Sequence, residues 1–191
     1  MNKKYEFTEE TRNYNGITLH RIRALRDFSY IKKGSLGGWI EKEDNLSHDG
    51  DCWVFGNAIG YNNSFVYENA EVFGNACIYG NAIAHDNSRI YGCAKVYGNA
   101  EVCENAEIRT YTCIKDDAII KSDFDYCIFS GFGIKAISIN AYRCKDGSIK
   151  VNIDGHDINI DEISKVNIFI KGFDKQYSLI ADTIKRYFEE N

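Results

Sequence analysis

A six-residue repeat runs through the middle of the chain and constrains the fold more than any other feature. It keeps one phase, without insertion or deletion, over residues 48–125, which makes thirteen hexads. Counted from Val54, position 1 is Val or Ile in ten hexads, position 5 is small in twelve, and position 4 is Asn in eight. A period of six fits neither a helix nor an alternating strand, because each unit holds a short extended piece and a corner.

Three hexads can close one triangular coil of 18 residues, and the positions then take distinct roles. Position 1 points its branched side chain inward, and position 5 is small because it lies where the wall turns. Gly at position 3 and Asn at position 4 are expected to supply the positive φ angles of the corners. The chain has 18 Asn and no Pro, and Pro would remove a hydrogen bond from stacked strands.

Residues 18 apart should stack on neighbouring rungs, and the outward positions agree with that spacing. One column at position 6 contains Glu71, Arg89 and Glu107, so that the charge alternates from rung to rung. A column at position 4 contains three Asn residues, 69, 87 and 105, whose amides can hydrogen-bond along a stack.

The repeat resembles the hexapeptide-repeat family, whose pattern is an aliphatic residue followed four positions later by a small one. The resemblance covers residues 48–125 and implies a left-handed parallel β-helix. The motifs Leu36-Gly37-Gly38-Trp39-Ile40-Glu41, Asn45-Leu46-Ser47 and Asp51-Cys52-Trp53-Val54-Phe55-Gly56-Asn57-Ala58 are also similar to phage and prophage proteins of this fold. That narrower resemblance covers residues 4–110, and most of those proteins have no assigned activity.

The flanking segments are predicted to cover the two open ends of the solenoid, which would otherwise extend by edge pairing. Residues 1–47 form an N-terminal β-hairpin cap, with its turn at Asn15-Gly16 and with Trp39 plugging the first coil.

Residues 126–191 form a small C-terminal α/β cap. Strands are expected at 137–141 and 149–153, on either side of a turn at Asp146-Gly147. A helix is expected between Asp161 and Gly172, and a last helix begins at Asp174.

Charge and cysteine content exclude several classes of function. The net charge of −5 argues against general nucleic-acid binding. No apolar run is long enough to span a bilayer, and the first residues lack a signal-peptide core, so we expect no membrane association and a cytoplasmic location. The seven Cys form no C-x-x-C pair, which indicates reduced thiols and predicts no metal site.

Position 2 should point outward, yet it is mostly aromatic. Ladder stiffening and an interface with a ligand, partner or subunit both explain this pattern, and the sequence leaves the two open. The candidate binding residues are Tyr61, Tyr79, Tyr97, Phe73, Tyr91, His85 and Arg109.

The family resemblance implies homo-oligomers, with trimers favoured, and ligand sites in clefts between subunits. It also implies that enzymatic members are acyltransferases, which use a His base and acyl-CoA. His85, beside Asp86, is the candidate base here, but the loop insertions that shape an acceptor pocket are missing from 48–125.

The preferred hypothesis is therefore a non-catalytic binding solenoid without a cofactor, encoded by a phage or prophage. It would bind a host protein, such as a defence protein, or sequester a small signalling molecule. The alternative is an acyltransferase that uses His85. End-to-end polymerisation is a third reading, which the two predicted caps disfavour.

Overall fold

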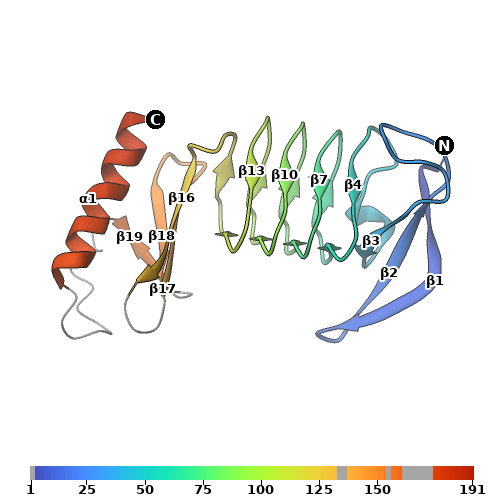
Figure 1. Cartoon of the computed structure of the whole chain (residues 1–191), viewed down its shortest axis with the longest axis horizontal. Helices are drawn as coiled ribbons and strands as arrows, with labels where there is room; N and C mark the ends of the chain where they lie inside the picture. The colour runs from blue at the N-terminus through green and yellow to red at the C-terminus, as the bar shows by residue number, and fades with distance from the viewer. Residues whose placement is uncertain (1–2, 133–136, 154–155, 161–173) are drawn as a thin grey trace. The chain divides into compact units, whose positions relative to one another are not determined.

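The computed structural model describes residues 3–132, 137–153, 156–160 and 174–191, and it is mainly β (Figure 1). The chain divides into two compact units, Met1–Ser122 and Asp123–Asn191. The predicted three-part division, at 47/48 and 125/126, stays a prediction. Within the described residues, no helix is both long and apolar enough to cross a membrane.

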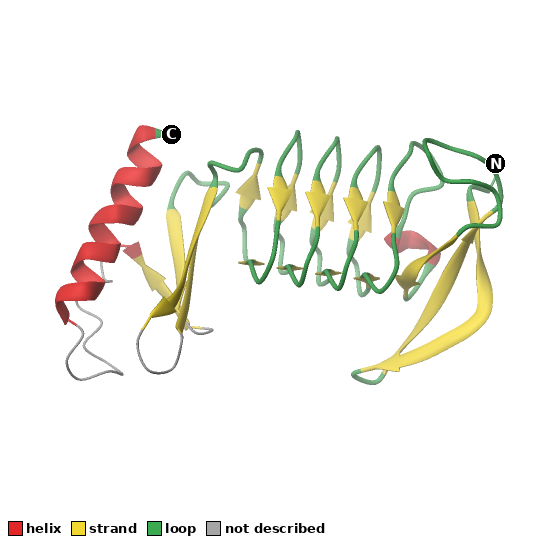
Figure 2. Ribbon diagram, in the orientation of Figure 1, coloured by secondary structure: helices red, strands yellow, loops and turns green. Residues whose placement is uncertain are grey.

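The first unit contains a parallel β-solenoid built from two-residue strands (Figure 2). Each strand consists of positions 6 and 1 of the repeat. The strands are β4 (Trp53–Val54), β5 (Ile59–Gly60), β6 (Phe65–Val66), β7 (Glu71–Val72), β8 (Cys77–Ile78), β9 (Ile83–Ala84), β10 (Arg89–Ile90), β11 (Lys95–Val96), β12 (Glu101–Val102), β13 (Glu107–Ile108), β14 (Cys113–Ile114) and β15 (Ile119–Ile120).

Three walls stack these strands with a spacing of 18 residues. The strand orders are β4-β7-β10-β13, β6-β9-β12-β15 and β5-β8-β11-β14. Arg89, for example, lies opposite both Glu71 and Glu107 in parallel register. The predicted 18-residue coil is therefore confirmed, whereas the left-handed winding implied by the resemblance stays a prediction.

The solenoid core follows the repeat as predicted. All ten Val and Ile residues at position 1 are 0% exposed, as are most of the small residues at position 5. Ser64, Ser88 and Thr112 at position 5 are also buried. Burial of each aliphatic side chain contributes about 1.5–3 kcal/mol to the free energy of unfolding. Small and branched side chains thus fill the interior of the prism.

The corners differ from the prediction in one respect. Positive φ angles fall at position 3, where the residue is Gly in six hexads, including Gly56 and Gly92, and another residue in six. No Asn at position 4 has a positive φ within residues 48–125, all of which the structure describes. These Asn residues instead form ladders: the Asn63 amide donates to Asn81 (3.2 Å), and that of Asn81 donates to Asn99 (3.0 Å).

The N-terminal segment forms a hairpin as predicted. β1 (Tyr5–Tyr14) and β2 (Ile17–Ala24) pair antiparallel about Asn15 and Gly16, which both have positive φ. β3 (Leu36–Ile40) pairs antiparallel with β2 and parallel with β5, and a short 3-10 helix, η1 (Glu43–Asn45), follows. β3 thereby begins one wall of the solenoid.

Trp39 does not plug the first coil, contrary to the prediction. Its side chain is only half-buried and lies beneath the guanidinium of Arg12, whose carbon is 4.5 Å from the ring centre. Trp53 is the buried tryptophan, 1% exposed, and packs edge-on against Tyr5 and Phe28. The alternation of β3 decides this outcome, because Ile40 faces inward and its neighbour must then face outward.

Lys4 fastens the hairpin to the start of the solenoid. Its side chain is fully buried, and Nζ donates to the carbonyl oxygen of Cys52 (2.9 Å) and, at 3.3 Å, to those of Asp49 and Gly50. Burial lowers the pKa of Lys4. Tyr5 completes the attachment by donating from its hydroxyl to the carbonyl oxygen of Leu46 (2.8 Å).

In its described residues, the second unit consists of a four-stranded antiparallel meander and one helix. Its elements are β16 (Tyr126–Phe132), β17 (Ile137–Arg143), β18 (Ile149–Ile153), β19 (His156–Asn159) and α1 (Asp174–Glu190). Ile180, Ile184 and Phe188 of α1 pack with Ile139 and Val151 of the sheet.

The strands at 137–141 and 149–153, their turn and the last helix are thus confirmed. Sequence analysis missed β16 and β19, because neither carries a clean alternation. The helix expected between Asp161 and Gly172 lies outside the described residues.

We predict that the corner at Thr110 is strained. Its φ is 58°, and a β-branched residue is disfavoured there. Thr110→Gly should raise the free energy of unfolding, measured by urea denaturation, by about 0.5–1 kcal/mol. The reason is that the relief of backbone strain in the folded state outweighs the conformational entropy that Gly adds to the unfolded chain.

Gly92→Ala, one rung earlier, should have the opposite effect. A Cβ at Gly92 would lie 2.8 Å from the backbone nitrogen of Thr110, and the position also has a positive φ. We expect a loss of about 1–2 kcal/mol. Equal stability of the two variants would contradict this account of the corners.

Candidate functional site

The outward residues at position 2 form stacked columns, because a parallel register places like positions one rung apart, about 4.8 Å. Ring centres are 4.9 Å apart for Tyr61 and Tyr79, and 4.8 Å apart for Tyr79 and Tyr97. Phe73 and Tyr91 stack at 4.8 Å in a second column. The structure therefore brings the predicted binding residues into columns, while their role in binding stays a prediction.

The column of Tyr61, Tyr79 and Tyr97 is partly covered by the chain's own hairpin. Tyr14 of β1 meets Tyr61 edge-on at 5.8 Å, and Leu19 of β2 lies in a cluster against which Tyr61 and Tyr79 pack. Burial raises the pKa of Tyr61 to about 12. Sequence analysis missed this contact, although the apolar residues Tyr14 and Leu19 could have signalled it.

The column of Phe73 and Tyr91 is contacted by an arginine side chain, whereas the column of Tyr61 is contacted by the hairpin. The guanidinium carbon of Arg89 lies 5.1 Å from the Phe73 ring centre and 5.9 Å from that of Tyr91. Arg89 also forms ion pairs with Glu71 (3.3 Å) and Glu107 (3.2 Å), as the alternating charges predict.

Glu107 contacts both Arg109 and Tyr91 of this column. Arg109 lies 3.3 Å from Glu107, and the Tyr91 hydroxyl donates to Glu107 at 3.0 Å. This hydrogen bond is the main cause that lowers the pKa of Glu107. We name the surface formed by Phe73, Arg89, Tyr91 and Arg109 the arginine–aromatic face.

His85 lies in the third column, stacked on Tyr67 with ring centres 4.9 Å apart. Its side chain is 17% exposed. Nδ1 lies 3.2 Å from Asp86 Oδ2 and 3.9 Å from Glu68 Oε2, whereas Nε2 lies 3.2 Å from Glu101 Oε1. A neutral imidazole can donate to one of these carboxylates and an imidazolium to both.

The ring of His85 is therefore oriented by the chain itself. A general base needs a lone pair that faces the substrate. Here each ring nitrogen faces a carboxylate of the same chain. A substrate would therefore have to displace one of these carboxylates before His85 could accept its proton.

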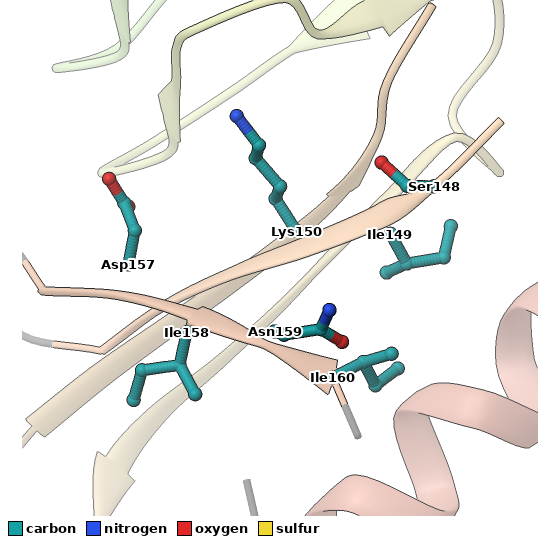
Figure 3. Close-up of a pocket in the computed structure, with 7 residues that line it drawn as sticks. All are labelled: Ser148, Ile149, Lys150, Asp157, Ile158, Asn159 and Ile160. Carbon is teal, nitrogen blue, oxygen red and sulfur yellow. The ribbon is translucent and has the colours of Figure 1, made fainter. Parts of the chain in front are cut away.

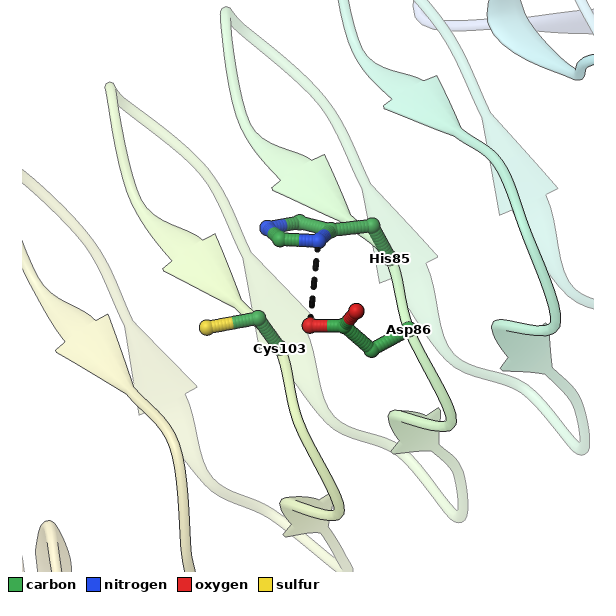
Figure 4. Close-up of side chains that lie close together, drawn as sticks. All are labelled: His85, Asp86 and Cys103. Carbon is green, nitrogen blue, oxygen red and sulfur yellow. Dashed lines mark ion pairs between the residues drawn. The ribbon is translucent and has the colours of Figure 1, made fainter.

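Cys103 occupies the next rung of the same column and lies close to His85 and Asp86 (Figure 4). It is 4% exposed. Burial, followed by the negative charges of Glu101, Glu104 and Asp86, raises the pKa of the Cys103 thiol to about 11. The sequence does not single out Cys103, because its proximity to Asp86 depends on side-chain geometry.

The carboxylates of Glu68 and Asp86, at the corners beside this column, also accept backbone hydrogen bonds. Glu68 Oε2 accepts the backbone N–H of Asp86 at 2.8 Å, and Asp86 Oδ2 accepts that of Glu104 at 2.8 Å. The bond from Glu104 is the main cause that lowers the pKa of Asp86. Each carboxylate thus satisfies a corner N–H of the next rung and is held in place beside His85.

The second unit has a shallow hollow of about 370 Å³ on β18 and β19 (Figure 3). It is lined by Ser148, Ile149, Lys150, Asp157, Ile158, Asn159 and Ile160. The Lys150 and Asp157 side chains extend from neighbouring strands, but the lining lacks a nucleophile–base pair. The position-2 columns therefore remain the better candidates for function.

Comparison with known proteins supports the repeat assignment. No model of a known protein family matches the chain. Over 73 residues it is 32% identical to a protein of Escherichia coli (strain K12) named "Uncharacterized acetyltransferase YdcK". The match covers 34% of this chain and 22% of that protein, so the chain matches about a fifth of its relative's length. Together, the β-solenoid and this similarity fit a hexapeptide-repeat protein.

We predict that Cys103 is a poor nucleophile in the native protein. A rise of the pKa from 9 to about 11 lowers the thiolate fraction at pH 8 about 100-fold. Iodoacetamide at pH 8 should leave Cys103 unmodified, as mapped by mass spectrometry, and the rate should increase as the pH approaches 11. The urea-unfolded chain is the control, and equal rates in both states would contradict the prediction.

Proposed function

We propose that this protein is a non-catalytic binding solenoid whose arginine–aromatic face is its contact surface. The observation that carries the proposal is the geometry of that face. Two stacked rings, Phe73 and Tyr91, lie beneath a guanidinium, and Arg89 and Arg109 are exposed beside them. Aromatic residues and arginine are the types enriched in the energetic centres of protein interfaces.

The unbroken register supports a binding role over an enzymatic one. The strands pair at 18-residue intervals from β4 to β15, which leaves no inserted loop to shape an acceptor pocket between residues 53 and 120. Both ring nitrogens of His85 face carboxylates of the chain, which also argues against its use as a base.

The assembly and partner belong to the same proposal. We take the contact to join copies of this chain, with a trimer favoured, because closed symmetry would cover the face on every subunit. The resemblance to phage and prophage proteins adds a bacterial cytoplasmic setting. The ligand would then be a host protein, such as a defence protein, or a small signalling molecule held in clefts between subunits.

Assembly tests this proposal through Tyr91→Ala. Truncation of a central aromatic at an interface costs about 2 kcal/mol, or about 30-fold in the dissociation constant. Light scattering after size exclusion should give a trimer mass for the wild type and a shift toward monomer for Tyr91→Ala.

Tyr111→Ala is the matched control, because Tyr111 is 72% exposed and lies outside the position-2 columns. It should assemble like the wild type, and circular dichroism should show that all three proteins are folded. A wild type that stays monomeric, or a Tyr91→Ala variant that assembles normally, would refute the role of this face.

A second candidate, an acyltransferase with His85 as base and acyl-CoA as donor, is supported by the similarity to a protein named as an acetyltransferase. For this reaction, the acyl acceptor would have to displace one of the carboxylates beside His85. General-base catalysis contributes about 10²–10⁴-fold in rate.

If this candidate is right, the protein should release CoA from acetyl-CoA when amine or hydroxyl acceptors are present. His85→Gln should lower that rate by about 10²–10⁴-fold. Absence of turnover on any acceptor, or turnover that survives His85→Gln, would remove the candidate.

A further inference from the structure

The third column of the solenoid brings together three different metal-ligand types. A ring nitrogen of His85, a carboxylate oxygen of Asp86 and Sγ of Cys103 lie within 4.8 Å of one another (Figure 4). The side chains come from two adjacent rungs, because Cys103 follows His85 by one 18-residue coil. We propose that His85, Asp86 and Cys103 bind a divalent transition-metal ion of the Zn²⁺ class.

The second ring nitrogen of His85 supports this assignment. Nε2 lies 3.2 Å from Glu101 Oε1, and an Nε2–H donated to that carboxylate fixes the tautomer. The lone pair is then on Nδ1, which faces Asp86 Oδ2 at 3.2 Å and Glu68 Oε2 at 3.9 Å. A ligating histidine held by a carboxylate through its other nitrogen is the usual outer-shell arrangement of zinc sites.

The donor set selects the class of ion. Nitrogen, thiolate and carboxylate together suit Zn²⁺ and Co²⁺, whereas Mg²⁺ and Ca²⁺ prefer oxygen alone. Tetrahedral zinc has Zn–S of about 2.3 Å and Zn–N of about 2.0–2.1 Å, so its donors lie about 3.3–3.6 Å apart. His85 Nδ1 and Asp86 Oδ2 already lie 3.2 Å apart. Rotation of the Cys103 side chain would close the remaining gap, and water or Glu68 can supply the fourth ligand.

The backbone holds the two rungs at the spacing that such a site needs. The N–H of His85 donates to the carbonyl oxygen of Val102 (3.0 Å), and that of Cys103 donates to Ile120 (2.9 Å). Asp86 is held by the N–H of Glu104. A bound ion would bridge consecutive coils and therefore stabilise the stack.

The local charge also favours a cation. Glu68, Asp86 and Glu101 surround the His85 ring, and Glu104 follows Cys103 on the next rung. Lys121, a cation of the same column, pairs with Glu104 at 3.5 Å. A divalent ion among these carboxylates would offset their mutual repulsion.

Cobalt titration of the full chain tests the proposal directly. Co²⁺ bound through Cys103 should produce a thiolate-to-cobalt charge-transfer band in the near ultraviolet that saturates at one ion per chain, and Zn²⁺ should bleach it. Cys103→Ser should abolish the band. Cys93→Ser is the matched control, because Cys93 is a half-exposed thiol outside the cluster, and it should keep the band.

A second measurement separates metal binding from a general effect on folding. Zn²⁺ should raise the Tm of the wild type but not that of Asp86→Asn. Glu101→Gln should weaken Zn²⁺ binding by about 10- to 100-fold while the band remains, because it alters only the orientation of His85. A wild type without a band, or a band that persists in Cys103→Ser, would overturn the proposal, whatever the outcome of the assembly experiment.

Discussion

The backbone ladder between consecutive coils is the interaction on which the rest of the first unit depends. The N–H of Phe55 donates to the carbonyl oxygen of Val72 (2.8 Å), and that of Glu71 donates to Ser88 (2.9 Å). The same bonds recur along three walls and fix every rung on the next. An inserted residue that did not loop out of the coil would shift the register of all later rungs, and the thirteen hexads here keep one phase.

This ladder turns a sequence period into columns of side chains with shared chemistry. Inward columns are aliphatic and small, and they exclude water from the prism. Outward columns are amide ladders, aromatic stacks and alternating charges, of which Glu71, Arg89 and Glu107 are one example. Both candidate functional surfaces lie on such columns, because the ladder places His85 and Cys103 one rung apart just as it places Phe73 and Tyr91.

Predictions from the sequence succeeded where a residue's role depends only on its place in the repeat. The buried position-1 residues, the 18-residue coil and the hairpin at Asn15-Gly16 follow from local pattern. Predictions failed where a residue's role depends on what lies beside it. Position-4 Asn was expected to turn the corner, yet its amide bonds to the next rung, and Trp39 was expected inside, yet it stacks beneath Arg12.

The sequence by itself determined the solenoid, its core and the columns, because a strict hexad admits few ways to bury its aliphatic and small positions. Only the tertiary structure decided which columns are covered and which groups meet. Leu19 packs near Tyr61 only after the hairpin folds back over the wall. Asp86 comes close to both His85 and Cys103 through side-chain directions at a corner, and no spacing in the sequence specifies those directions.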